Sequence, residues 1–451
     1  MPPLVSVITP AYNAERFIGQ AIASVRAQSM PDWEMVVADD GSTDGTIGIV
    51  QELAARDPHN VVQIDLPSGE GDARYENARM LLEAWRDKGV LVRDPEAAFY
   101  RYDQTFLPPG GGKAITRRGF LGLVRLHPFS DRVILPHERT LSGPKEDRYK
   151  LTRATRTQLS PGFMLYRDPK GELDAPLETG AVLTEFSTGD GVHHVLAKVT
   201  ATDALIAIVD GLRKSSLLIA DGHHRYETAV RVRDEIEAGG GAKERGEHRY
   251  FMTFLANGDD PRLVVFPTHR HVHSLAKIDF DDLLRKAQAL FVVDERKDAA
   301  TGEVLSRWLD EAPSKPAFVV ADPSGRAARL SLRAGVDLAA HPTLGQVHPT
   351  LRVTDVAVLH YGVLEAILGI SQEAQAKKTN IWYPQDGAGA LAELRGGKGQ
   401  LLFMMKGTPV DDVRRVAEAG EVMPQKSTFF YPKVLTGLLM HTLDPTRPVP
   451  L

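Results

Sequence analysis

The side chains best suited to chemistry gather in one short stretch of the sequence, Asp221-Gly-His-His-Arg225. Four apolar residues before it predict a buried strand, and a helical pattern follows it. A strand that turns at a glycine into a helix presents unpaired N–H groups and the positive end of the helix dipole. We therefore predict that Gly222, His223, His224 and Arg225 bind phosphate or carboxylate. The alternative is that Asp221 only caps the helix while the histidines form local hydrogen bonds.

A second polar stretch covers residues 135–148 and holds His137, Glu138, Arg139 and Lys145. A carboxylate among cations suits acid–base catalysis on an anionic substrate, so Glu138 is a candidate catalytic base, as is Asp221. His137, Arg139 and Lys145 are candidate substrate-binding residues. The alternative is a solvated loop, which is the usual environment of a charged run.

Two further groups of polar residues lie later in the chain. Lys426 stands close to a run of aromatic residues, as in many nucleotide pockets, and is a further candidate substrate-binding residue. Its segment, residues 423–433, could equally dock the C-terminal part of the chain onto the core. His269, His271 and His273 would share one face of a strand, as zinc ligands can, but no partner carboxylate accompanies them. We therefore predict no metal site.

These residues must be positioned by a mixture of helices and strands. Residues 4–10, 14–28 and 33–38 predict a strand, a helix and a second strand, which form a right-handed βαβ unit. The fold class is α/β with mixed sheets: a truncated Rossmann-like βαβ unit (1–50), then a large two-lobed mixed α/β domain (51–275 and 276–451). Further predicted elements are strands at 59–67, 97–102, 116–125, 249–256 (beside 217–220) and 263–273, and helices at 75–88 and 353–368.

The composition limits the class of protein. The chain has 451 residues, of which 43% are apolar and 25% charged, as in globular domains. A net charge of −5 gives no electrostatic reason to expect nucleic acid or membrane as a partner. Cysteine is absent, which excludes disulfides, thiolate catalysis and cysteine-based zinc sites. We predict a cytoplasmic protein with a small-molecule or nucleotide ligand, and leave its oligomeric state open.

The first 50 residues closely resemble the start of family 2 glycosyltransferases. The resemblance rests on Val-Ser-Val-Ile-Thr-Pro-Ala-Tyr-Asn-Ala and on Asp-Asp-Gly-Ser-Thr-Asp-Gly-Thr. It implies a vestigial sugar-nucleotide motif formed by Pro10, Tyr12, Asn13, Asp39 and Asp40. The later metal-binding Asp-x-Asp of that family has no counterpart, because its nearest spelling, at 279–281, opens a predicted helix. We predict an incomplete half-domain that packs on the edge of the main domain or lies apart.

The remaining chain resembles a bacterial family known only as domain of unknown function 1015. The motifs are Leu-Pro-His-Glu-Arg-Thr with Gly-Pro-Lys-Glu-Asp-Arg, Ala-Asp-Gly-His-His-Arg-Tyr-Glu-Thr-Ala and Met-Pro-Gln-Lys-Ser-Thr-Phe-Phe-Tyr-Pro-Lys. This resemblance brings no established activity, and the family's own N-terminal segment is replaced here. The second motif is also similar to that of sulfiredoxins and ParB-like proteins, some of which phosphorylate free serine. That similarity implies that Gly222, His224 and Arg225 bind phosphate.

Three functions are therefore possible. The first is a phosphate-handling enzyme, most concretely a kinase that uses ATP or ADP with Mg²⁺ and acts on a small hydroxyl compound such as serine. The second is a nucleotide- or metabolite-binding regulator without turnover. The third is sugar-nucleotide binding by the N-terminal segment.

Overall fold

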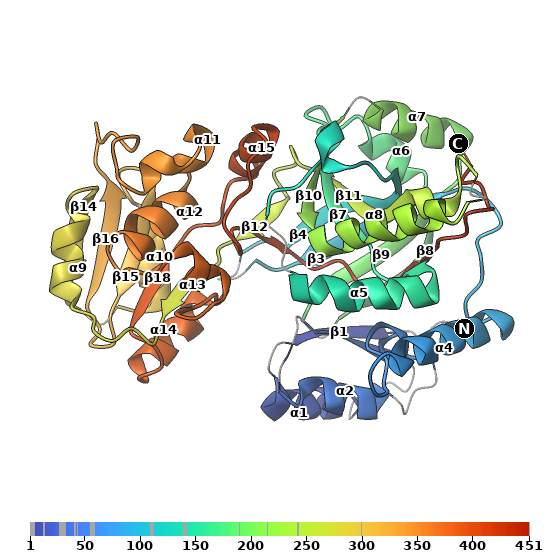
Figure 1. The fold of residues 1–451 in the computed structure, drawn as a ribbon, viewed down its shortest axis with the longest axis horizontal. Helices are drawn as coiled ribbons and strands as arrows, with labels where there is room; N and C mark the ends of the chain where they lie inside the picture. Colours follow the sequence, from blue (N-terminus) through green and yellow to red (C-terminus); the bar gives the residue numbers. More distant parts are fainter. Residues whose placement is uncertain are drawn as a thin grey trace. The chain divides into compact units, whose positions relative to one another are not determined.

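The chain forms two compact units, neither of which is continuous in sequence (Figure 1). The first comprises residues 1–134, 140–263 and 432–451, and the second comprises residues 135–139 and 264–431. The predicted lobe boundary between residues 275 and 276 stays a prediction. The structure, a computed structural model, describes residues 5–11, 14–26, 33–39, 42, 44–54, 59–108, 112–138, 142–188, 190–213, 215–240, 243–298 and 300–450.

The N-terminal βαβ unit is confirmed. Strands β1 (Val5–Ala11) and β2 (Trp33–Asp39) pair in parallel, with helix α1 (Glu15–Arg26) between them and α2 (Thr46–Ala54) after them. Ile18, Ile22 and Val50 form its small buried core. The two strands form a sheet of their own and are no part of the larger sheet of the first unit.

An eight-stranded sheet is the centre of the first unit. Strands β7 and β11 pair in parallel, whereas β3, β4, β8 and β9 pair with their neighbours in antiparallel fashion, so the sheet is mixed as predicted. Its order is β5 (Ile134–Leu135), β10 (Leu217–Asp221), β7 (Gly162–Tyr166), β11 (Tyr250–Asn257), β4 (Ile115–Arg125), β3 (Phe99–Phe106), β9 (His193–Val199) and β8 (Ala181–Ser187).

The two faces of this sheet differ. On one face, Phe120 and Phe251 pack with residues of helices α6 (Asp174–Glu178), α7 (Thr202–Leu212) and α8 (His223–Ala238) in one hydrophobic core. The other face carries Tyr102, Gln104 and Arg117, because side chains alternate along a strand.

Residues 432–450, which we call the C-terminal segment, belong to the first unit although they follow the second unit in sequence. The other elements of the first unit are α3 (Val62–Asp65), α4 (Ala73–Asp87), η1 (Phe129–Asp131), α5 (Ser142–Thr155), η2 (Glu247–Arg249) and the paired strands β6 (Thr157–Gln158) and β20 (His441–Thr442).

The second unit contains a six-stranded sheet whose neighbouring strands are all antiparallel. Its order is β14 (Phe291–Arg296), β16 (Ala327–Leu332), β15 (Ala317–Ala321), β18 (Leu401–Met404), β13 (Arg270–Val272) and β17 (Ile381–Trp382). Strands β12 (Val264–Phe266) and β19 (Phe429–Tyr431) form a separate pair. The helices are α9 (Phe280–Ala287), α10 (Gly302–Asp310), η3 (Leu344–Gln346), α11 (Pro349–Arg352), α12 (Asp355–Ala357), η4 (Val358–Glu365), α13 (Gln372–Ala376), α14 (Gly387–Arg395) and α15 (Val410–Glu418).

Several predicted elements were wrong. Residues 62–65, within the strand predicted at 59–67, form the short helix α3. The strand predicted at 263–273 is two strands, β12 and β13, and Pro267 between them has no N–H to donate to a ladder. Strand β11 does not adjoin β10, because β7 lies between them. The helix predicted at 353–368 includes a π-helix, η4. The polar stretch at 135–148, for which a solvated loop was the alternative, is helical from Ser142 onward. No helix in the described part of the chain could cross a membrane.

Candidate functional site

The turn predicted to bind an anion has the expected local geometry. Strand β10 is buried from Leu217 to Ala220, and Gly222 follows it in the left-handed conformation, with φ 92° and ψ 28°. Helix α8 begins at His223, and its N-cap residue is Gly222, which has no side chain to cap it. Among the described residues, the Asp221 carboxylate accepts from Lys433 and not from the helix N-terminus. The sequence folds this way because glycine alone adopts that φ without strain.

Arg225 folds back over the glycine. Its Nη1 donates to the carbonyl of Pro161, and its Nη2 lies 3.8 Å from Oδ1 of Asp221. A Cβ placed on Gly222 would lie 3.1 Å from the Arg225 Nε and Nη2 atoms, so the guanidinium rests directly on the turn. The Arg225 side chain is 30% exposed, and a guanidinium has five N–H donors, which leaves capacity for an anion.

Asp221 is held as a carboxylate by cations. Its Oδ2 accepts a hydrogen bond from Nζ of Lys433 at 3.1 Å. Burial raises the pKa of Asp221, but the positive charges of Lys433, Arg225 and His223 lower it by a larger amount, so the net pKa lies below its usual value. A carboxylate this acidic is a weak proton acceptor while both cations face it. Its predicted role as a base therefore requires that a bound anion first draw Lys433 and Arg225 away.

The sequence indicates Lys433 only as one polar residue of the 423–433 segment, and its place at the 221–225 turn was not predicted. Lys433 lies 212 positions from Asp221 in the chain, so no local pattern joins them. Its backbone carbonyl accepts from Nε2 of Gln104 at 2.9 Å, and that of Pro432 accepts from Nη2 of Arg117 at 2.6 Å. The one available signal was its place in the aromatic segment that also holds Lys426.

The second unit brings together another group of predicted site residues. His137 is fully buried, and its Nε2 lies 2.9 Å from Oγ1 of Thr428. Oε1 of Glu138 accepts from the backbone N–H of Ser427 at 3.3 Å. Glu138 thus adjoins the segment that carries Lys426, as a shared site requires. Arg139 lies outside the described residues, and Lys145 lies on α5 of the first unit with a side chain that is not described.

A buried arginine fixes the backbone at Lys426. Arg270 is 1% exposed and donates from Nη2 to the Lys426 carbonyl at 3.2 Å and from Nε to Nε2 of His360 at 3.0 Å. Lys426 has φ 57°, a conformation that costs a lysine about 1 kcal/mol or more and persists only when its surroundings impose it.

The glycosyltransferase-like motif lies largely outside the described side chains. Tyr12, Asn13 and Asp40 are not described, and Pro10 and Asp39 are described only as residues of β1 and β2. The described side chains of the neighbouring loop have a structural role. Oγ1 of Thr46 accepts from the N–H of Ala14 at 2.7 Å, and Asp44 accepts from that of Glu15, so this loop caps α1.

His271 lies in β13 and His269 and His273 flank it, and all three contact neighbouring residues of the second unit. Nδ1 of His269 accepts from the Met405 N–H at 3.1 Å. The ring of Trp382 stacks on His273, with centroids 4.0 Å apart, and meets His271 edge-on at 5.3 Å. Among the described residues, no group of three or more His, Cys, Asp or Glu could hold a metal.

We expect protein purified without chelators to contain no stoichiometric zinc, because the three imidazoles do not converge. Metal analysis by mass spectrometry tests this. About one zinc per chain, lost in His271→Ala but retained in His193→Ala, would show that the prediction is wrong.

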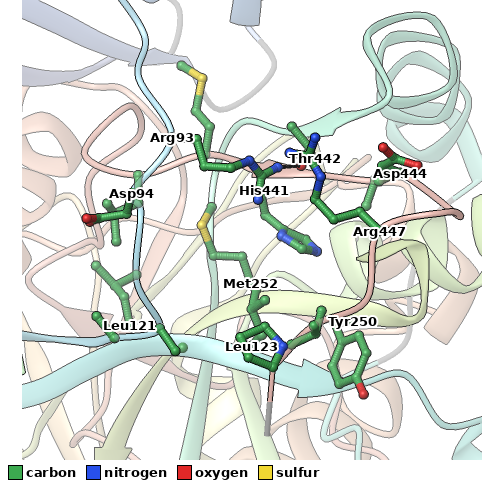
Figure 2. Close-up of a pocket in the computed structure, with 18 of the residues that line it drawn as sticks. Arg93, Asp94, Leu121, Leu123, Tyr250, Met252, His441, Thr442, Asp444 and Arg447 are labelled. Atoms are coloured by element: carbon green, nitrogen blue, oxygen red, sulfur yellow. Dashed lines mark hydrogen bonds between the residues drawn. The ribbon is translucent and has the colours of Figure 1, made fainter. Parts of the chain in front are cut away.

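A cavity of about 1730 Å³ lies elsewhere in the first unit (Figure 2). Leu121, Leu123, Tyr250 and Met252 of β4 and β11 form an apolar floor, and residues 437–450 of the C-terminal segment line another side. The lining also includes residues at the C-terminal end of α8, whereas the 221–225 turn lies at its N-terminal end. None of the predicted site residues lines this cavity, so we base the candidate site on the turn.

Comparisons with known proteins support both resemblances. The model of Glycosyl transferase family 2 matches residues 6–80. The teichuronic acid biosynthesis protein TuaG of Bacillus subtilis, named as a glycosyltransferase, is 49% identical over 16% of this chain and 29% of its own length. An Escherichia coli chondroitin synthase is 45% identical over 12% of this chain and 8% of its own. The chain thus spans less than a third of either relative.

Solved structures show a more distant similarity. A conserved hypothetical protein from Pyrococcus furiosus is 15% identical, with a TM-score of 0.35 over 72% of this chain and 95% of the other. A free serine kinase in complex with AMP is 14% identical, with a TM-score of 0.36 over 72% and 92%. The similarity of residues 221–229 to sulfiredoxins stays a prediction. The model described as Protein of unknown function (DUF1015) matches residues 46–357, more than half of the chain, and the chain belongs to that family.

Proposed function

We propose that the first unit binds the phosphate groups of a nucleotide at the 221–225 turn, and that the protein is a phosphotransferase. The observation that carries the proposal is the left-handed Gly222 between a buried strand and a helix N-terminus, with Arg225 and Lys433 beside it. Backbone N–H groups, the helix dipole and two cations then favour the same negatively charged ligand. The acceptor is a small hydroxyl compound such as serine.

The chemistry follows from these groups. The acceptor hydroxyl oxygen bonds to the terminal phosphorus of ATP or ADP, the bond from that phosphorus to the bridging oxygen breaks, and the shortened nucleotide leaves. Arg225 and Lys433 stabilise charge on the transferred group, and the hydroxyl proton passes to Asp221. Mg²⁺ would neutralise the nucleotide phosphates and would take its ligands mainly from phosphate oxygens and water, which leaves Asp221 as the proton acceptor. Within the second unit, His137, Arg139 and Lys426 stay proposed binding residues and Glu138 a proposed base, and Lys145 stays a proposed binding residue of the first unit.

We expect Arg225→Ala to weaken binding of ADP or inorganic phosphate by roughly 1.5–3 kcal/mol, the range for a hydrogen bond to a charged group. Isothermal titration calorimetry measures the effect. Arg231→Ala is the matched control, because Arg231 lies on the same helix but is paired at the surface with Glu146 and Tyr149. Equal affinity in the two variants would show that Arg225 does not bind the anion.

Turnover distinguishes the enzyme from the regulator. Phosphorus NMR of wild-type protein with ATP or ADP, Mg²⁺ and serine or another small alcohol should show a new phosphate monoester. Binding without any such product favours the nucleotide-binding regulator. Binding of sugar nucleotides alone, unaffected by Arg225→Ala, would favour the third function and assign it to the N-terminal βαβ unit.

A further inference from the structure

A row of buried polar side chains crosses the first unit's sheet on the face opposite α8. Gln104 of β3 stands directly across from Arg117 of β4 on one side and His194 of β9 on the other. All three are 1% exposed or less. Nδ1 of His194 lies 2.7 Å from the hydroxyl of Tyr102, two residues from Gln104 on the same face. A polar row this deep in a sheet is costly unless its hydrogen bonds are specific.

Arg117 is the unusual member of the row. Its guanidinium lies 4.7 Å from the ring centre of Phe163 and 5.2 Å from that of Phe254. Nη2 donates to Oε1 of Gln104 and to the Pro432 carbonyl, while Nε and Nη1 have no hydrogen-bond partner among the described residues. No carboxylate in the described part of the chain forms an ion pair with it. Burial lowers the pKa of Arg117 to about 9, and Asp221 is among the groups that act against this shift.

The row acts on the candidate site through the backbone of the C-terminal segment. Arg117 holds the carbonyl of Pro432, and Gln104 holds that of Lys433, at 2.6 and 2.9 Å. With these two carbonyls fixed, the Lys433 side chain reaches Asp221. The uncompensated charge of Arg117 also adds positive potential near the turn, and a low-dielectric interior transmits that potential well.

We propose that Gln104 and Arg117 are positioning residues of the phosphate site: they fix Lys433 against Asp221 and supply a buried positive charge behind the turn. This deepens the proposed function and rests on it for the identity of the ligand. The placement of Lys433 itself can be tested without any ligand.

The decisive variant is Gln104→Glu. It keeps the side-chain shape and gives Arg117 a carboxylate partner, and this ion pair offsets the lost hydrogen bond to the Lys433 carbonyl, so the fold should stay close to wild type in stability. It also removes the Nε2 donor from the Lys433 carbonyl and neutralises the buried charge. A merely structural role predicts that a fold of equal stability binds equally well. Our proposal predicts a stable protein with a loosened Lys433 and a weaker site.

The first measurement is competitive labelling with limiting acetic anhydride, followed by mass spectrometry. Acetylation of Lys433 should rise about two- to fivefold in Gln104→Glu and in Arg117→Met, the range expected when a partly exposed ion pair is lost. Lys170, which is 81% exposed, is the reference, and Lys198, which is 15% exposed and paired with Asp94, reports general loosening. Arg118→Met is the matched control, because Arg118 faces Asp103 and Glu178 instead.

The second measurement is the dissociation constant of ADP, which should rise about tenfold in Gln104→Glu, as for one charged hydrogen bond. An unchanged Lys433 rate in folded Gln104→Glu overturns the proposal, as does an equal rise at Lys198. If Arg117→Met does not fold, the Gln104→Glu result decides alone. If wild-type protein binds no nucleotide or phosphate, the proposed function fails, while the labelling still confirms or refutes the positioning of Lys433.

Discussion

Gly222→Val is expected to abolish detectable binding of phosphate and nucleotide and to lower the free energy of unfolding by about 1–3 kcal/mol. The stability loss follows from φ 92°, which a β-branched residue adopts only with strain. The binding loss has a second cause. A Cβ at this position lies 3.1 Å from two nitrogen atoms of Arg225, so the guanidinium must shift, and the two methyl groups of valine displace it further. The variant therefore disturbs the backbone donors and the arginine together, which Arg225→Ala alone does not.

Gly240→Val separates these two causes. Gly240 follows the same helix with φ 76°, and a Cβ there meets no atom within 4 Å. This control carries a similar backbone penalty at the other end of α8 and leaves Arg225 in place. Urea denaturation and calorimetry of both variants should therefore show similar losses of stability but a loss of binding only in Gly222→Val. Wild-type affinity in Gly222→Val would refute the anion site.

The part of the site that could be predicted is the part whose determinants are adjacent in sequence. An apolar run, a glycine and a helical pattern are enough to specify the turn, because each acts on its own backbone. The Glu138 neighbourhood is different. Its contact with Ser427 spans 289 positions, so a sequence can nominate each residue but cannot pair them. Arg117 was missed for another reason, since an arginine in a strand is ordinarily assigned to the exposed face.

The errors in the fold have similar physical causes. Residues 358–364 are buried on nearly every side, so their apolar pattern cannot distinguish an α-helix from the π-helix that forms. The run at 263–273 has strand composition throughout, but its two halves pair with different partners, β19 and β18. Which partner a strand finds is a property of the whole unit. Local propensity does not contain it.

Buried histidines give the other large prediction, a marked loss of stability between about pH 6.5 and pH 5. Burial lowers the pKa of His194 to about 3 and those of His269 and His441 to about 4. In the unfolded chain each of them titrates near pH 6.5. Below that pH the unfolded state binds protons that the folded state does not bind, so the folded state loses stability as pH falls. Above pH 6.5 both states are neutral and the effect vanishes.

The size follows from linkage. Each such histidine lowers the free energy of unfolding by about 1.36 kcal/mol per pH unit, or by about 2 kcal/mol between pH 6.5 and 5. Asp355 acts in the opposite direction, because burial raises its pKa to about 6, and it offsets part of the loss below that pH. In an unfolded chain carboxylates change charge mainly below pH 5, so the histidines dominate this window.

Urea denaturation near pH 7 and near pH 5 measures the loss, and His194→Gln tests its origin. This variant removes one titrating ring from the first unit while leaving an amide that can still bond the Tyr102 hydroxyl. Its own stability at pH 7 will be lower, but its dependence on pH should shrink by about 2 kcal/mol over the window. His59→Gln, which replaces an exposed histidine, should leave the dependence unchanged. Equal stability of the wild-type protein at the two pH values would mean that these histidines gain protons without unfolding the chain, and hence that their burial is not maintained in acid.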